Sequence, residues 1–205
     1  MKKKDEIIDR SFKLFLRYGV QHITMDDVAN ECGISKKTIY KYFENKNDLL
    51  HHAIEIQVNK LEINLKTYPE KFPNAIISLK SFFDSITTVF DIISPVFVAE
   101  IKKFYPNIYI EILKLKETII SPFIKENINQ GKKEKLYKNN LIDDEFSKSY
   151  NIILNMIFMN SFSTNSKGEQ HQSIVFFNNL FLHRLVSIKG LNELNKINLK
   201  IDNNP

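Results

Sequence analysis

Residues 24–46, TMDDVANECGISKKTIYKYFENK, are the stretch that decides how this chain folds. Thr24 followed three residues later by Asp27 is typical of a capping box. The hydroxyl accepts a hydrogen bond from a free helical N–H, and the carboxylate favours the positive end of the helix. Gly33 ends this first short helix, because glycine enters the left-handed conformation at little cost. Ser35 is a good N-cap for a second short helix, KKTIYKYF.

The second helix has distinct inner and outer faces. Ile39 and Phe43 are four residues apart and therefore share one face, which we expect to point inward. The other faces are basic, hydroxylic and aromatic. Two short helices joined by a tight glycine turn, the second basic and aromatic outside, predict a helix-turn-helix. A blander alternative for Tyr40 and Tyr42 is that they only cover a small three-helix core.

Length and composition favour a soluble, helical protein with one large or two small domains. The chain has 205 residues, 43% of them hydrophobic and 26% charged, with only five Gly and six Pro to break long elements. A net charge of +5 is compatible with a polyanionic partner, although the Lys- and Asn-rich composition of an AT-rich genome would give the same charge. The fold class predicted is all-α.

The single cysteine and the N-terminus indicate a cytoplasmic protein. Cys32 has no second cysteine with which to form an internal disulfide, which fits a reducing compartment. The first ten residues, MKKKDEIIDR, lack the apolar segment of a signal peptide. No run of about 18 uncharged apolar residues predicts a membrane span.

Helices are predicted on both sides of the helix-turn-helix. Residues 5–18 carry Ile8, Phe12 and Phe15 on one stripe. The helix that starts after Asn45 has apolar residues on several faces, as a helix contacted from two sides requires, and we expect it to end at the prolines of Tyr68-Pro69 and Phe72-Pro73. The boundary is placed in its first residues, which gives a helix-turn-helix domain at 1–46 and a second domain at 47–205.

The second domain is predicted to be helical throughout, with breaks at proline, glycine or Asn-rich segments. The long element around Pro122 should be kinked or split there. The last residues, 191–205, are expected to fray. The predicted helices cover residues 74–93, a short segment between Pro95 and Pro106, and residues 107–129, 143–162 and 169–188.

Residues 7–50 resemble the DNA-binding domain of the TetR family of bacterial transcriptional regulators. The resemblance rests on IIDRSFKLFLRYG, then ITMDDVANECGISKKTIYKYF, then ENKNDLL, which agree with the family in order, spacing and residue type. It does not extend by motif beyond residue 70. For that part it implies only an all-helical domain that binds an effector and dimerises.

The resemblance implies a set of DNA contacts. The start of the supporting helix offers N–H groups to a phosphate, and the first turn of the reading helix reaches base edges in the major groove. Phenolic and ammonium groups beyond that turn are expected to contact flanking phosphates. The residues are Thr24, Met25, Ser35, Lys36, Lys37, Thr38, Tyr40, Lys41, Tyr42 and Lys46.

One such domain contacts few phosphates, so we expect a homodimer on a pseudo-palindromic operator, with half-sites about 34–36 Å apart. The helices predicted at residues 143–162 and 169–188 are apolar on faces that one domain does not need. They are the candidates for a self-complementary four-helix interface between two copies.

An apolar or aromatic effector is the expected small-molecule partner, because phenylalanine and adaptable methionine are frequent in the second domain. The sixteen phenylalanines fit a plain core equally well. Glu100 could instead pair with Lys102 or Lys103, and Asn155 and Asn160 could bond across a dimer interface. The candidate effector residues are Phe97, Glu100, Phe104, Asn155, Met156 and Met159.

No pattern of catalytic, cofactor-binding or metal-ligating residues is found, so we predict no enzyme activity, no cofactor and no metal. His51 and His52 are adjacent and diverge by about 100° on a helix, which does not suit a shared metal. The basic run at 132–138 is expected to be a solvated loop, with an acidic lipid or protein contact as an alternative. The predicted function is a repressor released from a palindromic operator by a small effector. The alternative is a hydrophobe- or lipid-binding helical protein with a vestigial helix-turn-helix.

Overall fold

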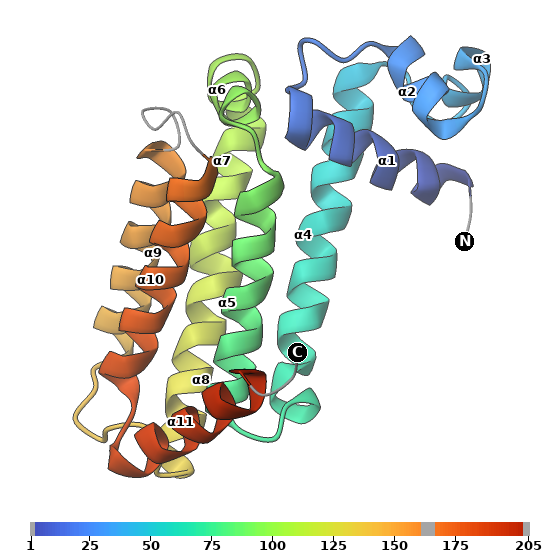
Figure 1. The fold of residues 1–205 in the computed structure, drawn as a ribbon. Coiled ribbons are helices and arrows are strands. Elements are labelled where there is room, and N and C mark those ends of the chain that lie inside the picture. Colours follow the sequence, from blue (N-terminus) through green and yellow to red (C-terminus); the bar gives the residue numbers. More distant parts are fainter. Residues whose placement is uncertain (1–2, 161–166, 203–205) are drawn as a thin grey trace. The chain divides into compact units, whose positions relative to one another are not determined.

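The computed structural model describes residues 3–160 and 167–202, with the side chains of 157–160, 167, 170 and 198–202 left out of the description. The described residues are helical, which confirms the predicted all-α class (Figure 1). They form two compact units, Met1–Glu62 with Ile92–Lys114 and Ile63–Asp91 with Leu115–Pro205. This division differs from the boundary expected at residues 46 and 47, because residues 92–114 belong with the helix-turn-helix.

The first unit contains the predicted helix-turn-helix. Its helices are α1 (Lys3–Tyr18), α2 (Met25–Cys32), α3 (Lys36–Ile39), the first part of α4 (Lys46–Lys71), α6 (Pro95–Phe104) and most of α7 (Pro106–Leu115). Helix α1 packs against α2 and α6. In its predicted apolar stripe Ile8 and Phe15 are buried and Phe12 is half-buried. Ile39 and Phe43 are buried as well, so the inward orientation predicted for them is confirmed.

The caps read from the sequence are present. The Thr24 hydroxyl accepts from the Asp27 N–H at 3.1 Å, and the Asp27 carboxylate accepts from the Thr24 N–H at 2.8 Å. Gly33 ends α2 with a φ of 63°, and Ser35 caps α3 by accepting from the Thr38 N–H at 3.2 Å. Helix α3 is shorter than predicted, because it ends at Ile39 and residues 40–42 continue as turns.

Helix α4 is longer than predicted and runs through Pro69 to Lys71. A proline in the last turns of a helix removes one backbone hydrogen bond and need not end it. Tyr68 is held there by edge-on contacts with the Phe72 and Phe123 rings, at centroid distances of 4.8 Å and 5.5 Å. The break therefore falls at Phe72-Pro73.

The second unit is a helical bundle around an aromatic core. It comprises the end of α4, α5 (Ala75–Ile92), the π-turn η1 (Lys116–Ile120), α8 (Ser121–Lys133), α9 (Asp143–Asn160), α10 (Lys167–Leu185) and α11 (Ile188–Asp202). Helices α8, α9 and α10 run side by side in Figure 1, with α11 across one end. Phe82, Phe83, Tyr150 and Phe181 form a network of ring contacts, so these phenylalanines are core residues.

A π-turn marks the split expected near Pro122. Residues 116–120 form η1, and α8 begins at Ser121 with Pro122 in its first turn. Residues 106–133 are helical without a break, so Pro122 lies within a continuous run, and the π-turn just before it is where the regular hydrogen-bond ladder is interrupted.

The C-terminal residues do not fray as expected but form α11 as far as Asp202, and residues 203–205 lie outside the described part. Leu194 is buried in this helix. The Ser187 hydroxyl accepts from the Gly190 N–H at 3.1 Å and donates to the Lys135 carbonyl at 2.8 Å. The side chain of Ser187 thus caps α11 and ties it to the preceding loop.

The basic run at 132–138 is built into the second unit instead of forming a solvated loop. Lys132 donates to the Leu141 carbonyl at 2.7 Å and pairs with Asp143. Lys138 donates to the Arg184 carbonyl at 3.0 Å. Tyr137 is fully buried, and its hydroxyl donates to the Ala75 carbonyl at 3.1 Å. These contacts join the ends of helices, so much of the positive charge has a structural role.

We expect Gly190→Ala to detach α11 and lower the melting temperature. A Cβ at this position would lie 2.0 Å from the Leu136 carbonyl oxygen, which is backbone and cannot rotate away. Such overpacking costs about 1–3 kcal/mol. Gly168→Ala is the matched control, because no atom of the described residues lies within 4 Å of a Cβ there. Thermal unfolding followed by circular dichroism checks this, and equal melting temperatures for the two variants would contradict it.

Candidate nucleic-acid interface

The outer side of α3 and of the turn after it brings most of the predicted DNA-contact residues to one surface. Tyr40 and Tyr42 are 47% and 41% exposed, which does not suit the alternative that they only cover the core. Ser35 and Thr38 join this surface through a 2.9 Å contact between their hydroxyls. Six of the set are exposed there: Ser35, Lys36, Lys37, Tyr40, Lys41 and Tyr42.

The lysines of this surface differ in their partners. The Lys36 ammonium donates to the Asp26 carboxylate of α2 at 2.7 Å, and this hydrogen bond raises the pKa of Lys36. Within the described part of the chain, no ion pair engages Lys37 or Lys41. Lys37 and Lys41 are therefore the more available cations.

The start of α2 offers backbone donors. The capping box satisfies the N–H groups of Thr24 and Asp27, and the bonds from Thr24 lower the pKa of the Asp27 carboxyl. The N–H groups of Met25 and Asp26 remain as first-turn donors for an anion. The Met25 side chain is 7% exposed, so this residue has only its backbone to offer.

Lys46 has a different role from the phosphate contact expected for it. Its ammonium donates to the carbonyls of Val20, Gln21 and Ile23, at 2.7, 3.3 and 2.8 Å. Burial lowers the pKa of this amine. An ammonium has three donors, and here all three are directed into the protein. Lys46 therefore holds the segment between α1 and α2 and is not free to reach DNA.

Glu100, on α6, binds the same segment. Its carboxylate accepts from the N–H groups of Val20 and Gln21, the latter at 2.9 Å, and its side chain is buried. This corrects the expected effector role of Glu100 and its alternative pairing with Lys102 or Lys103. We call Glu100 and Lys46 together the loop clamp.

The loop clamp requires glycine at position 19. Gly19 has a φ of 85°, which side chains other than glycine rarely adopt. A Cβ there would also lie 2.7 Å from the Glu100 Oε2 atom. The end of α1 is thus shaped to admit the carboxylate.

The predicted effector residues are divided between the two units. Phe97, Glu100 and Phe104 lie on α6 in the first unit, where Phe97 is buried and Phe104 is 50% exposed. Asn155 and Met156 lie on α9 in the second unit. The side chains of Met159 and Asn160 are outside the described residues.

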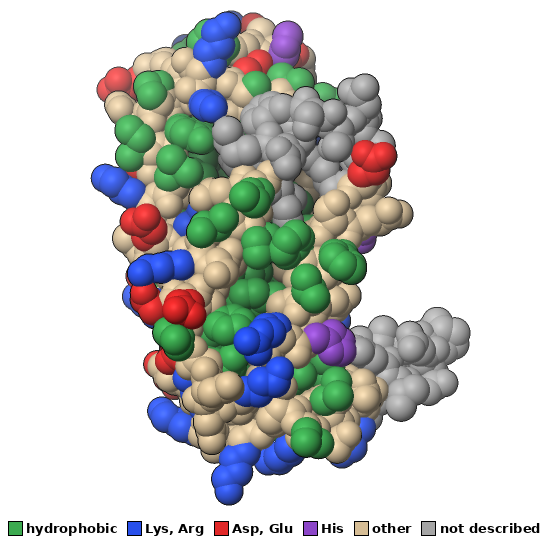
Figure 2. All heavy atoms as spheres, turned by 90° about the vertical axis from the view of Figure 1, so that its left-hand side faces the viewer, with side chains coloured by type: hydrophobic (Ala, Val, Ile, Leu, Met, Phe, Trp, Pro, Cys, Tyr) green, Lys and Arg blue, Asp and Glu red, His purple; other side chains and the backbone are tan. Residues whose placement is uncertain are grey.

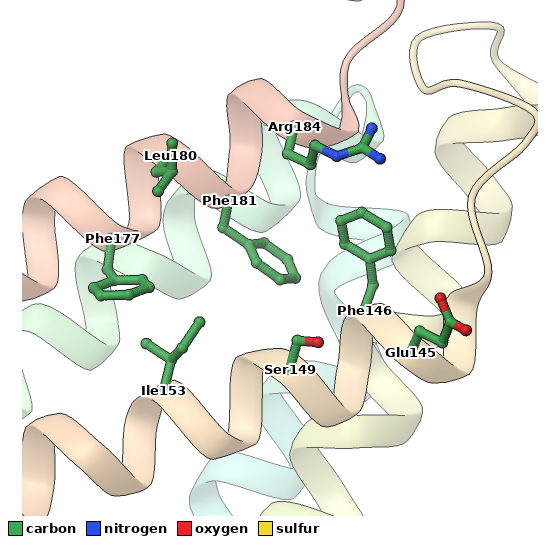
Figure 3. Close-up of a pocket in the computed structure, with 8 residues that line it drawn as sticks. All are labelled: Glu145, Phe146, Ser149, Ile153, Phe177, Leu180, Phe181 and Arg184. Carbon is green, nitrogen blue, oxygen red and sulfur yellow. The ribbon is translucent and has the colours of Figure 1, made fainter.

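An apolar groove lies between α9 and α10, the two helices predicted to dimerise. Figure 3 shows the rings of Phe146, Phe177 and Phe181 between these helices, with Glu145 and Arg184 toward one end. Hydrophobic side chains also follow the outer face of the pair (Figure 2). None of the candidate effector residues lines the groove, whose residues are Glu145, Phe146, Ser149, Ile153, Phe177, Leu180, Phe181 and Arg184.

We expect Lys46→Met to destabilise the first unit. The change keeps the aliphatic stem but removes three hydrogen bonds from a charged donor, two of them partly buried, so three carbonyls lose their partner. The expected loss in the free energy of unfolding is about 2 kcal/mol. Lys41→Met is the control, because Lys41 is exposed. Urea unfolding measures both, and a loss no greater than that of the control would contradict the structural role.

A family model agrees with the N-terminal segment. Residues 7–53 match the model described as bacterial regulatory proteins, tetR family. An uncharacterized HTH-type transcriptional regulator, YerO of Bacillus subtilis, is 37% identical over 68 residues, which is 33% of this chain. The chain covers only 24% of the length of that relative.

Solved structures show that the fold extends over nearly the whole chain. A transcriptional regulator from Cytophaga hutchinsonii has a TM-score of 0.72 at 18% identity, with 90% of this chain and 99% of that chain covered. A TetR transcription regulator from Haloarcula marismortui has a TM-score of 0.69 at 14% identity, with 90% and 98% covered.

Among the described residues, no single helix is long and apolar enough to cross a membrane, and α5 and α6 pass that test only as a broken pair. The same residues contain no group of three or more His, Cys, Asp or Glu side chains placed to hold a metal. Residues 7–53 are thus similar to the bacterial regulatory proteins of the tetR family, and they form the helix-turn-helix of this chain.

Proposed function

We propose that this protein is a homodimeric, sequence-specific DNA-binding regulator. In this proposal it represses transcription until a small apolar or aromatic effector releases it from a palindromic operator. The observation that carries the proposal is the exposed basic and aromatic surface of α3, set on a capped helix-turn-helix that matches the family model.

In this proposal, some residues of the surface recognise the DNA sequence and others position the domain on the DNA backbone. Lys37 and Thr38 lie in the first turn of α3, from which side chains reach base edges in the major groove. A lysine there donates to guanine, and a threonine methyl contacts the thymine methyl. Tyr40, Lys41 and Tyr42 follow the helix and suit the flanking phosphates, which fix the register without reading sequence.

Lys36 can contact DNA only after it leaves its present partner. Its ammonium is tied to Asp26 on α2, so it must exchange that carboxylate for DNA before it contributes. The exchange replaces one solvent-exposed ion pair by another, so the net gain in binding free energy is small. Lys36 therefore adds less to affinity than Lys37 or Lys41.

The dimer is proposed from the outer face of α9 and α10. Four large apolar side chains on these helices are more than half exposed: Ile152 (55%), Met156 (60%), Phe176 (66%) and Leu180 (54%). Leu180 also lines the apolar groove. Contiguous exposed apolar surface of this kind is typical of an interface. A two-fold axis would place α9 and α10 against the same helices of the second copy and bury all four side chains.

The alternative, a hydrophobe-binding protein whose helix-turn-helix no longer binds DNA, requires loss of the basic surface. Lys37, Tyr40, Lys41 and Tyr42 remain exposed on it. We therefore favour the regulator.

Random-sequence duplex DNA distinguishes the two functions. We expect binding at low salt, with an affinity that falls steeply as salt rises because neutralised phosphates release counterions. Lys41→Ala should lower the slope of log K against log salt by about one unit. Lys60→Ala is the control, since Lys60 pairs with Asp9 on another surface of the same unit. Fluorescence anisotropy measures both slopes, and no binding by the natural protein at low salt would overturn the proposal.

The proposed dimer is tested by placing a charge on the face of α9 and α10. We expect Phe176→Glu to raise the dimer dissociation constant at least about tenfold, since a buried charge opposes association and central aromatic side chains dominate interfaces. Ile63→Glu is the matched control, because Ile63 is 64% exposed against 66% for Phe176. Sedimentation equilibrium gives the constants. The interface is misplaced if both variants dimerise as the natural protein does.

A further inference from the structure

A lysine–asparagine cluster lies where the π-turn η1 meets α9, and neither the DNA surface nor the dimer face uses it. Asn151 and Asn155 are one helical turn apart on α9 and therefore share a face. The Asn151 amide donates to the Lys116 carbonyl at 3.1 Å and to the Ser121 hydroxyl at 2.6 Å. The Lys116 ammonium donates to the Asn155 side-chain oxygen. The cluster thus joins η1, the start of α8 and α9.

One acceptor in the cluster has no donor. The side-chain oxygen of Asn151 is buried and makes no hydrogen bond within the described part of the chain. Buried polar atoms are nearly always paired, so an unpaired acceptor calls for an explanation, and a donor from a bound molecule is one. This unpaired oxygen belongs to the same side-chain amide whose nitrogen donates to the Lys116 carbonyl.

The backbone at the cluster is also unusual. A single π-turn inserted between two α-helices is rare and is frequently found at functional sites. Here the π-turn begins at Lys116 and ends at the buried Ile120. A continuous α-helix would place Lys116 at a different angle relative to α9, so the π-turn positions the amine.

The chemistry of the cluster selects an acid. Burial lowers the pKa of the Lys116 amine to about 8, so the amine is still mainly protonated at neutral pH while poorly hydrated. A partly buried ammonium gains most from an anion that forms charge-assisted hydrogen bonds. A neighbouring hydroxyl or N–H of the ligand would supply the donor that the Asn151 oxygen lacks. Ile120 and Leu154, each 3% exposed, are apolar neighbours on η1 and α9.

We propose that Lys116, Asn151 and Asn155 bind the carboxylate end of the effector, which is a small organic acid with an apolar body. This inference rests on the proposed effector-responsive function and names the chemical class of the effector. In it, the carboxylate replaces the Asn155 oxygen as acceptor for the Lys116 ammonium. A donor next to the carboxylate then satisfies Asn151.

The test compares acids with their uncharged amides on the full chain. The probes are 3-phenylpropanoate with 3-phenylpropanamide, decanoate with decanamide, and phenyllactate, which adds a hydroxyl beside the carboxylate. We expect at least one acid to bind about tenfold more tightly than its amide, since a hydrogen bond to a charged group contributes about 1.5–3 kcal/mol. We also expect phenyllactate to bind more tightly than 3-phenylpropanoate. Isothermal titration calorimetry gives the affinities.

Variants tie the difference to the cluster. Lys116→Met should abolish the preference for acid over amide and should fold, because replacing a desolvated charge by an apolar side chain is often neutral or stabilising. Lys148→Met, on an exposed side chain of α9, should keep the preference. Asn155→Asp places a carboxylate against Lys116, so it should raise the melting temperature and exclude the acids, which keeps the test decisive if the Lys116→Met chain does not fold.

The outcomes separate this inference from the proposed function. An equal affinity for acids and amides in the natural protein would overturn the inference, as would an acid preference that survives in Lys116→Met or, if that chain does not fold, in Asn155→Asp. DNA is absent from these titrations. A protein that binds acids through Lys116 but fails to bind duplex DNA at low salt would contradict the regulator and leave the acid site intact.

Discussion

The arrangement of the helix-turn-helix depends on two oppositely charged side chains that bind the backbone of the segment between α1 and α2. Glu100 accepts from the N–H groups of Val20 and Gln21, while Lys46 donates to the carbonyls of Val20, Gln21 and Ile23. This segment connects α1 to α2, and its conformation sets where the capping box of α2 begins. Hydrogen bonds to charged groups in a partly buried setting are stronger than neutral ones, so the loop clamp fixes the start of the helix-turn-helix.

The parts of the helix-turn-helix that could be predicted are local. Thr24 with Asp27, Gly33, and Ser35 with Thr38 act within a few residues of one another, and the structure confirms each cap. The loop clamp could not be predicted, because Glu100 is 80 residues from Val20 in sequence and its partners are backbone groups that any residue carries. The same reason explains Lys46, whose position next to a basic helix favoured a phosphate contact that its geometry does not provide.

In the second unit, the positions of the breaks between helices were easier to predict than the C-terminal helix and the polar cluster around Lys116. Proline placed most helix boundaries, but Pro69 lies inside α4, since aromatic packing of Tyr68 outweighs one lost hydrogen bond. Helix α11 was missed because the Asn- and Lys-rich composition of the tail favoured fraying, although Leu191, Leu194 and Ile197 recur at helical spacing. Ser187 and the backbone of the preceding loop hold its start. Asn155 was a candidate effector residue from the sequence, but its partner Lys116 was not, because nothing in the sequence marks a π-turn.

The position of Glu100 has a consequence for how the protein can be divided. A fragment that ends at residue 46, or a chimaera that joins residues 1–46 to a foreign helical domain, would keep every exposed side chain of α3 but lose the carboxylate that the Val20 and Gln21 N–H groups require. It would also keep Gly19, with a vacant space where the carboxylate belongs. The smallest fragment that keeps the helix-turn-helix in this arrangement is therefore discontinuous in sequence, and it includes α6 as well as the first helices.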